Sequence, residues 1–214
     1  MKGFLNLAEV GKFLKHALYV RREEILLEGN FGNLCEYVIN DTLVIREIEA
    51  KDQETLSRFY AESKLSDLYT KERIQRYFSN GCRCHVAKRG ERIIGHIWWG
   101  GHDMKFRSCD PALRYLKDSF KPGIKAVIGV DFYIVPEERG RGTALEFMHK
   151  MWQRLQGLGY EQWLGTVSPD NRGARWTYKL LGYQDVRKIV IHRIFNYFVF
   201  IGGELYFSPH SHSS

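Results

Sequence analysis

The sequence predicts an α/β fold in which a central mixed sheet is flanked by helices. The chain has 214 residues, of which 44% are hydrophobic and 14% aromatic, enough for one hydrophobic core. Runs rich in β-branched and aromatic residues alternate with segments whose apolar residues recur at helical spacing. One such run, at residues 126 to 135, leads through a glycine-bearing turn directly into a helical segment.

The N-terminal part, residues 1 to 40, is predicted to be a helical and strand extension. Residues 4 to 18 have the spacing of a basic amphipathic helix, and a strand is expected at 33 to 40. Such a helix can lie on a membrane, but packing onto its own domain or onto a second subunit is the commoner outcome. We expect residues 41 to 207 to form the main domain and residues 208 to 214 to form a disordered tail.

Within the main domain, the pattern predicts strands and helices in a definite order. The expected elements are a strand at 42 to 48, helices at 52 to 65 and 70 to 79, a hairpin at 82 to 88 and 92 to 99, a short helix at 112 to 120, a strand at 126 to 135, a helix with core residues Leu145, Met148, Trp152 and Leu155, a strand at 161 to 167, a helix at 172 to 181, and one or two strands at 185 to 200. The excursion at 101 to 123 is long for a compact domain, so we expect acceptor recognition near it.

Composition excludes several classes of protein. No stretch is long and apolar enough to span a bilayer, and the N-terminus lacks the features of a signal peptide, so a cytoplasmic location is predicted. The four cysteines do not have the paired spacing of a zinc site and are interpreted as reduced thiols, with no metal expected. The net charge of +7 suits an anionic partner, but dispersed basic residues favour a solvated surface over a nucleic-acid site.

The turn that follows the strand at 126 to 135 has the features of a phosphate-binding loop. Its residues are Arg139, Gly140, Arg141, Gly142, Thr143 and Ala144. Glycines allow the backbone to approach an anion closely, and the following helix directs its first amides toward the same point. A P-loop is excluded because no lysine follows Gly142, and a dinucleotide fingerprint fits poorly because Leu145 stands where a third small residue is needed.

The pattern Arg139-x-x-Gly142-x-Ala144 resembles the Q/R-x-x-G-x-G/A signature of the GNAT superfamily, the acyl-CoA-dependent N-acyltransferases. A second segment, from Asn171 to Tyr183, resembles the family's helix that an asparagine opens, that carries a tyrosine and that closes at a glycine and an aromatic residue. The resemblance covers residues 41 to 194. It implies a GNAT fold, with a mostly antiparallel sheet splayed at the acyl-CoA site.

The same resemblance implies an activity, namely transfer of an acetyl group from acetyl-CoA to a primary amine by direct attack in a ternary complex, with no metal. It also implies the residues that contact the cofactor, through main-chain groups on the strand, the turn amides and a helix start. These are Tyr133, Ile134, Val135, Arg139, Gly140, Arg141, Gly142, Thr143, Ala144 and Asn171. Asn171 is equally suited to cap its helix.

Two side chains are candidates for the chemistry that the resemblance implies. Tyr178 matches the tyrosine that can protonate the departing thiolate, although it can also be a packing aromatic. Asp131 is a candidate base for the acceptor amine, and it can instead bind the acceptor ammonium or serve the structure. His85 and His96 are further candidate bases, but a core or edge histidine whose hydrogen bonds are satisfied is the favoured interpretation of each.

Two other functions remain open from the sequence. A GNAT-like module could bind acyl-CoA without turnover, for regulation, and it would release no thiol with any amine. An anion or nucleic-acid binder would bind oligonucleotides in a salt-dependent way that free coenzyme A does not reverse. The acceptor, the acyl chain preferred and the oligomeric state, including a possible homodimer, are not determined by the sequence.

Overall fold

The computed structural model describes residues 19 to 33, 43 to 105, 111 to 194, 198 to 201 and 204 to 207. The strands in this part of the chain are β1 (Tyr19–Asn30), β2 (Val44–Ile48), β3 (Arg83–Arg89), β4 (Arg92–Gly100), β5 (Ala126–Ile134), β6 (Gln162–Val167), β7 (Gln184–Ile194), β8 (Phe198–Ile201) and β9 (Glu204–Phe207). The helices are α2 (Gln53–Glu62), α3 (Lys71–Ser79), α4 (Pro111–Asp118), α5 (Thr143–Gly157) and α6 (Arg172–Leu180), with short 3-10 helices η1 (Phe31–Asn33), η2 (Ala50–Asp52) and η4 (Pro136–Glu138).

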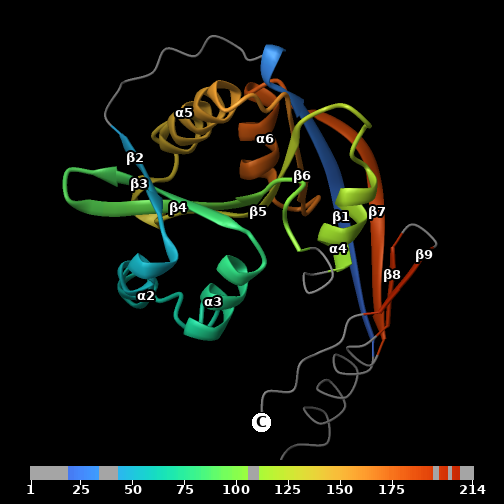
Figure 1. Cartoon of the computed structure of the whole chain (residues 1–214), viewed down its shortest axis with the longest axis horizontal. Helices are drawn as coiled ribbons and strands as arrows, with labels where there is room; N and C mark the ends of the chain where they lie inside the picture. Colours follow the sequence, from blue (N-terminus) through green and yellow to red (C-terminus); the bar gives the residue numbers. More distant parts are fainter. Residues whose placement is uncertain (1–18, 34–42, 106–110, 195–197, 202–203, 208–214) are drawn as a thin grey trace, which may run out of the picture.

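The strands of the described residues form one sheet in the order β2-β3-β4-β5-β6-β1-β7-β8-β9. Every neighbouring pair is antiparallel except β5 and β6, which are parallel. Parallel neighbours need a crossover, and α5 supplies it between these two strands. Helices α2 and α3 lie on one face of the sheet and α5 and α6 on the other (Figure 1). The predicted mixed, mostly antiparallel sheet flanked by helices is confirmed.

Helix α5 covers the centre of the sheet with an apolar stripe. Its predicted core residues Leu145, Met148, Trp152 and Leu155 are all buried. The stripe follows from their helical spacing, which brings them to one side of the helix. The ring of Phe147 on α5 packs 5.7 Å from the ring of Phe132 on β5. This contact ties the helix to the strand that precedes it in the chain.

The opposite face of the sheet is covered by α2 and α3. The Thr70 side chain accepts a hydrogen bond of 3.3 Å from the Arg73 amide and so caps α3. On the inner side of α3, Tyr77 and Phe78 pack on the Trp98 indole, with ring centroids 4.9 and 5.0 Å apart. This pair of helices therefore borders β4 and β5, where the functional site lies.

Most of the predicted main-domain elements are present, but the sequence pattern missed β1. This strand lies between β6 and β7 in the sheet. The first half of β1 contains four successive charged residues at 21 to 24, which interrupt the alternation of apolar and polar residues typical of a strand. These charges form ion pairs such as Arg22–Glu24 at 3.1 Å. Strand β9 was not predicted either. The division at residues 40 and 207 stays a prediction. The helix at 4 to 18, the tail and the strand at 33 to 40 lie outside the described residues, except that Asn33 is described and ends the 3-10 helix η1.

Two further predictions can be compared with the described residues. Cys82 and Cys84 are buried and form no disulfide bond within the described residues, in agreement with the prediction of buried reduced thiols, while Cys35 and Cys109 lie outside the description. None of the described helices is long and apolar enough to cross a membrane.

Candidate functional site

The turn between β5 and α5 is exposed, and two glycines set its shape. Gly140 and Gly142 both have a φ of 77°, in the left-handed region that favours glycine. A Cβ placed on Gly140 would meet no atom within 4 Å, so there is open space beside this residue. Gly142 is the N-cap of α5, and its position has no side-chain cap. The first amides of α5 are thus arranged as in an anion-binding helix N-terminus. We call residues 139 to 144 the cradle.

The first residue of α5 also suits an anionic ligand. Thr143 is buried, and within the described part of the chain its hydroxyl Oγ1 has no hydrogen-bond partner. Buried hydroxyls are normally hydrogen-bonded, so this donor calls for an acceptor. Phosphate oxygens held by the cradle amides could supply one. These residues therefore fit the diphosphate of coenzyme A.

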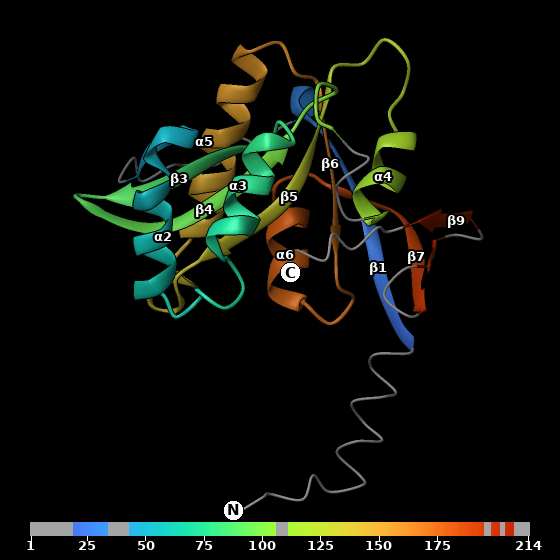
Figure 2. The same ribbon diagram turned by 60° about the horizontal axis from the view of Figure 1, so that its bottom comes forward.

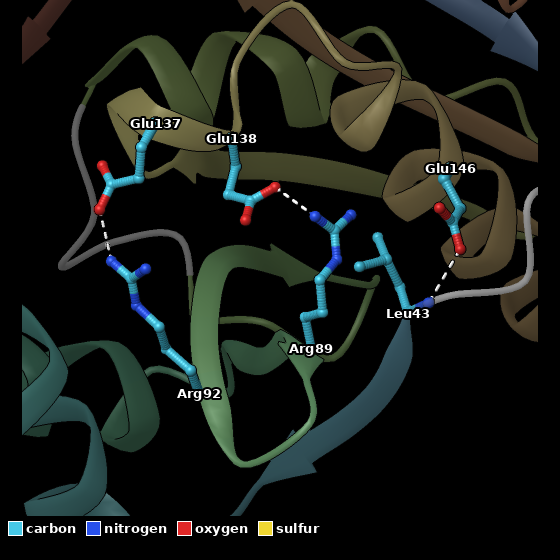
Figure 3. Close-up of polar contacts among 6 residues, drawn as sticks. All are labelled: Leu43, Arg89, Arg92, Glu137, Glu138 and Glu146. Carbon is cyan, nitrogen blue, oxygen red and sulfur yellow. Dashed lines mark hydrogen bonds and ion pairs between the residues drawn. The ribbon is translucent and has the colours of Figure 1, made fainter.

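Ion pairs hold the cradle against the β3–β4 hairpin (Figure 3). Glu138, the last residue of η4, is buried, and its Oε2 lies 2.6 Å from Nη1 of Arg89 at the end of β3. The exposed Glu137 pairs in the same way with Arg92 at the start of β4. Hydrogen bonds between a guanidinium and a carboxylate are short and strong, so Glu138 can serve as an anchor. Both carboxylates next to the cradle are thus paired with arginines.

A second anchor fixes the helix itself. Glu146, in the first turn of α5, accepts a hydrogen bond of 2.9 Å from the Leu43 amide (Figure 3). Lys150, one turn further on, donates to the Leu43 carbonyl at 2.5 Å. Together they bind both main-chain groups of the residue that enters β2. The start of α5 is therefore held to the edge of the sheet.

Beyond its first residues, β5 separates from β6. The two strands are paired only from Ala126 to Ile128 on β5 and from Gln162 to Leu164 on β6, although β5 continues to Ile134. Figure 2 shows the two strands together at one end and apart at the other, with α6 in the space between them. In a strand, main-chain groups alternate between its two edges, so β5 presents unpaired groups to this opening. The splay implied by the family resemblance is present here.

Three residues near the end of β5 are expected to contact the pantetheine arm, and they differ in what their main chain already binds. Tyr133 is half-buried at the splay. The Ile134 carbonyl accepts a hydrogen bond of 2.9 Å from Nε of Arg139, whose guanidinium also lies 5.3 Å from the Tyr133 ring centroid. The Val135 amide donates to the Ile94 carbonyl at 2.9 Å. Tyr133 pairs with His96 on β4, so its main chain, like the Val135 amide, is directed to β4, and Ile134 between them faces the opening. Arg139 folds back onto β5.

A β-bulge decides which face of the sheet Asp131 occupies. Trp98 pairs with Asp131 and the next residue, Trp99, pairs with Gly129, so Val130 is an extra residue in β5. Such a bulge reverses the alternation of side chains on its strand. Asp131 consequently lies on the same face as Trp98, toward α2 and α3. The phenol of Tyr69 donates a hydrogen bond to its Oδ2.

The surroundings of Asp131 favour proton exchange. Burial raises the pKa of Asp131, while the hydrogen bond from Tyr69 and the positive charge of Arg73 oppose this change. The Arg73 guanidinium lies 5.0 Å from the centroid of the Tyr69 ring. A carboxylate with a raised pKa is a better proton acceptor than an ordinary one. Sequence reasoning missed Tyr69 and Arg73, and no local motif signals them, because they meet Asp131 only through the fold.

Tyr178 lies on α6, across the splay from β5. Burial, and secondly the charge of Asp131, raises the pKa of Tyr178 to about 12. Its phenol therefore keeps its proton at neutral pH and can donate it. Its ring packs at 5.0 Å against that of Tyr183. The packing interpretation and the acid interpretation are thus compatible with the same position.

Asn171 opens α6 as an N-cap. Its Oδ1 accepts a hydrogen bond of 3.1 Å from the Ala174 amide. This part of the prediction is confirmed. Because the side-chain oxygen is used in this way, the NH2 group remains as a donor for a ligand.

The two histidines considered as bases are core residues, as favoured from the sequence. His85 and His96 are both buried. Burial lowers the pKa of each to about 3, so both are neutral at physiological pH. The His96 ring lies within 5.2 Å of the rings of Tyr60 and Tyr69. The expectation that its hydrogen bonds are satisfied is wrong, because neither of its nitrogens has a partner among the described residues. His96 therefore packs against Tyr69, the residue that donates a hydrogen bond to Asp131. No group of histidines, cysteines and carboxylates that could hold a metal occurs in the described part of the chain.

Comparisons with solved structures show what this arrangement is similar to. A protein of unknown function from Staphylococcus epidermidis has a TM-score of 0.58 and 10% identity, over 89% of this chain and 68% of that one. A GCN5-related N-acetyltransferase from Kribbella flavida has a TM-score of 0.50 and 14% identity, over 86% of this chain and 62% of that one. A glucosamine N-acetyltransferase region in a fungal multi-domain β-N-acetylglucosaminidase has a TM-score of 0.56 and 13% identity, over 89% of this chain and 23% of that one.

At these identities the similarity concerns the fold. The chain spans only part of each of these proteins, and no curated protein matches it. A family model described as the acetyltransferase (GNAT) family matches residues 47 to 183. This range is more than half of the chain, and it includes both the cradle and α6. The chain therefore belongs to the GNAT family of acetyltransferases.

Proposed function

We propose that this protein is an N-acetyltransferase that moves an acetyl group from acetyl-CoA to a primary amine by direct attack in a ternary complex. The observation that carries the proposal is the succession of sites along one strand. The cradle follows the C-terminal end of β5. The open edge of β5 extends from the cradle back to Asp131, whose side chain faces α2 and α3. An extended thioester carrier with its phosphates at the cradle would reach the level of Asp131 with its acyl end.

Asp131 and Tyr178 would move the protons of this reaction. An acceptor amine enters as an ammonium, which has no lone pair, so Asp131 accepts a proton from it directly or through water. The amine nitrogen then forms a bond to the thioester carbonyl carbon, and the bond from this carbon to sulfur breaks. Tyr178 donates its proton to the departing sulfur, and the second proton that the nitrogen loses on becoming an amide returns to Tyr178 through water. The products are an amide and the free thiol of coenzyme A, and no redox step is needed.

Cofactor contacts are proposed for the residues of the cradle and its neighbours. The amides from Gly140 to Ala144 would bind the diphosphate, with the exposed Arg141 available as a counter-charge. Main-chain groups of Tyr133, Ile134 and Val135 would pair with the amides of the pantetheine arm, with Ile134 facing the opening. Asn171 would add its NH2 group. A cytoplasmic location remains a prediction from the sequence.

The first experiment is calorimetric titration with acetyl-CoA, followed by measurement of thiol release over a library of primary amines. We expect binding in the micromolar range and thiol release that depends on both acetyl-CoA and one class of amine. Binding without thiol release for any amine would identify a non-catalytic acyl-CoA module instead. If acetyl-CoA does not bind but oligonucleotides do, in a salt-dependent manner, the proposal is wrong.

A further inference from the structure

The point where β5 and β6 separate is occupied by a tryptophan between two glycines. The last paired residues of the two strands are Ile128 and Leu164. The next residue on each strand is a glycine, Gly129 on β5 and Gly165 on β6. Trp163 precedes Leu164 on β6, and its side chain is fully buried. This residue therefore stands at the closed end of the splay.

Distances show that the indole fills this point. A Cβ added to Gly129 would lie 2.4 Å from Cζ2 and 2.9 Å from Nε1 of Trp163, closer than real side-chain contacts allow. A Cβ added to Gly165 would lie 3.4 Å from the same Nε1. The edge of the indole thus rests against both glycine backbones. No larger residue at position 129 could coexist with this indole position, since interiors are close-packed.

The indole is not held there by a hydrogen bond. Nε1 of Trp163 is buried and has no partner within the described residues. A buried donor without a partner is unfavourable, and a phenylalanine or leucine at this position would avoid that cost. The role of Trp163 at this position therefore depends on the volume of its side chain.

We propose that Trp163 closes the acyl end of the site and restricts the donor to short acyl chains such as acetyl. The inference rests on the proposed function, because it assumes a carrier whose phosphates lie at the cradle and whose arm follows β5. From Gly129 to Ile134 this strand spans about 17 Å. A carrier lying along it ends against the Trp163 indole. The acyl methyl would be the last group in front of the ring, and each further methylene would meet the indole.

The test compares acetyl-CoA with butanoyl-CoA in the wild type, Trp163→Phe and Trp163→Leu. A rigid pocket discriminates by about 10 to 200-fold per methylene, so the wild type should prefer acetyl-CoA by at least about 100-fold in kcat/KM. We expect this preference to fall by at least tenfold in Trp163→Leu and by less in Trp163→Phe. If Trp163→Leu does not fold, Trp163→Phe alone must show a fall in the same direction.

Trp152→Leu is the matched control. Trp152 on α5 is also fully buried, its Nε1 also lacks a partner among the described residues, and it packs elsewhere, with its ring 4.8 Å from that of Tyr183. This variant should lose stability and keep the wild-type preference for acetyl-CoA. An equal change of preference in Trp152→Leu and Trp163→Leu would overturn the proposal, as would an unchanged preference in both Trp163 variants.

A binding measurement separates this proposal from the activity. S-ethyl-CoA and S-butyl-CoA carry the same chain lengths on a thioether and cannot transfer them. Suppose that no amine supports thiol release, but that the wild type binds S-ethyl-CoA more tightly than S-butyl-CoA and that Trp163→Leu reduces this ratio of affinities tenfold. The activity proposal then fails and the role of Trp163 stands. If neither thioether binds, both proposals are wrong.

Discussion

Neutralising Glu138 offers a sharp test of how the cradle is held. In the variant Glu138→Gln, the 2.6 Å ion pair with Arg89 is lost while the shape of the side chain is kept. Hydrogen bonds between charged groups contribute about 1.5 to 3 kcal/mol to stability. The Arg89 side chain is 38% exposed, so solvent screening reduces the loss to about 1 to 2 kcal/mol. Thermal unfolding measures this loss.

The effect on coenzyme A binding has two contributions of opposite sign. Removing one negative charge near the two charges of the diphosphate strengthens binding by about 0.8 kcal/mol, for a separation of about 10 Å in water. Loosening η4 weakens binding, because ordering one residue of the turn costs about 1 to 2 kcal/mol. The second contribution is larger. We expect the affinity for coenzyme A to fall by about 1.5 to 8-fold.

Calorimetry on three variants separates the two contributions. Glu137→Gln also removes a charge next to the cradle, but from an exposed ion pair, so its affinity should be unchanged or slightly higher. Arg89→Met breaks the same ion pair as Glu138→Gln with the opposite change in charge, and it should weaken binding too. If Glu138→Gln binds coenzyme A more tightly than the wild type while Arg89→Met binds it more weakly, charge alone governs affinity and the anchoring argument is refuted.

Three more substitutions test the site. Tyr178→Phe should lower kcat by at least about 100-fold through loss of the acid, with Tyr183→Phe as the neighbouring control that retains activity; equal activity in both would make Tyr178 structural. Because burial raises the pKa of Asp131, wild-type kcat/KM should fall as pH drops through that pKa and the carboxylate is protonated; Asp131→Asn should lack this acid limb, and an unaltered pH profile would exclude Asp131 as the base. Gly140→Ala and Gly123→Ala introduce the same backbone strain, because the two glycines have φ values of 77° and 80° and no atom lies near the new methyl group. Each substitution should cost about 1 kcal/mol of stability, but only Gly140→Ala should weaken coenzyme A binding.

The parts of the fold that the sequence predicted are those set by local pattern. The cradle could be recognised because a strand, a proline, two glycines and a helix follow one another within a few residues. The α5 core positions follow from their spacing alone. Strand β1 escaped because its charges from Arg21 to Glu24 interrupt the alternation, and its position between β6 and β7 depends on pairing with segments more than 130 residues away.

The residues of the candidate site also divide into those that a local motif predicts and those that only the fold brings together. Asp131 and Tyr178 were identified through a family resemblance carried by short motifs. Tyr69, which donates to Asp131, is 62 residues distant in sequence and belongs to no motif. The bulge at Val130, which turns Asp131 toward α2 and α3, depends on the register with β4. Contacts of this kind are properties of packing, and a linear pattern does not contain them.

The central claim is that the cradle amides bind the diphosphate of coenzyme A. Titration of 15N-labelled protein with coenzyme A, followed by amide NMR, tests it most directly. The account predicts saturable shifts of the amide resonances of Gly140, Gly142 and Thr143, and smaller shifts of the same resonances with inorganic pyrophosphate. Unchanged cradle resonances at saturating coenzyme A, with shifts confined to residues elsewhere such as His102 and Ile124, would contradict the account.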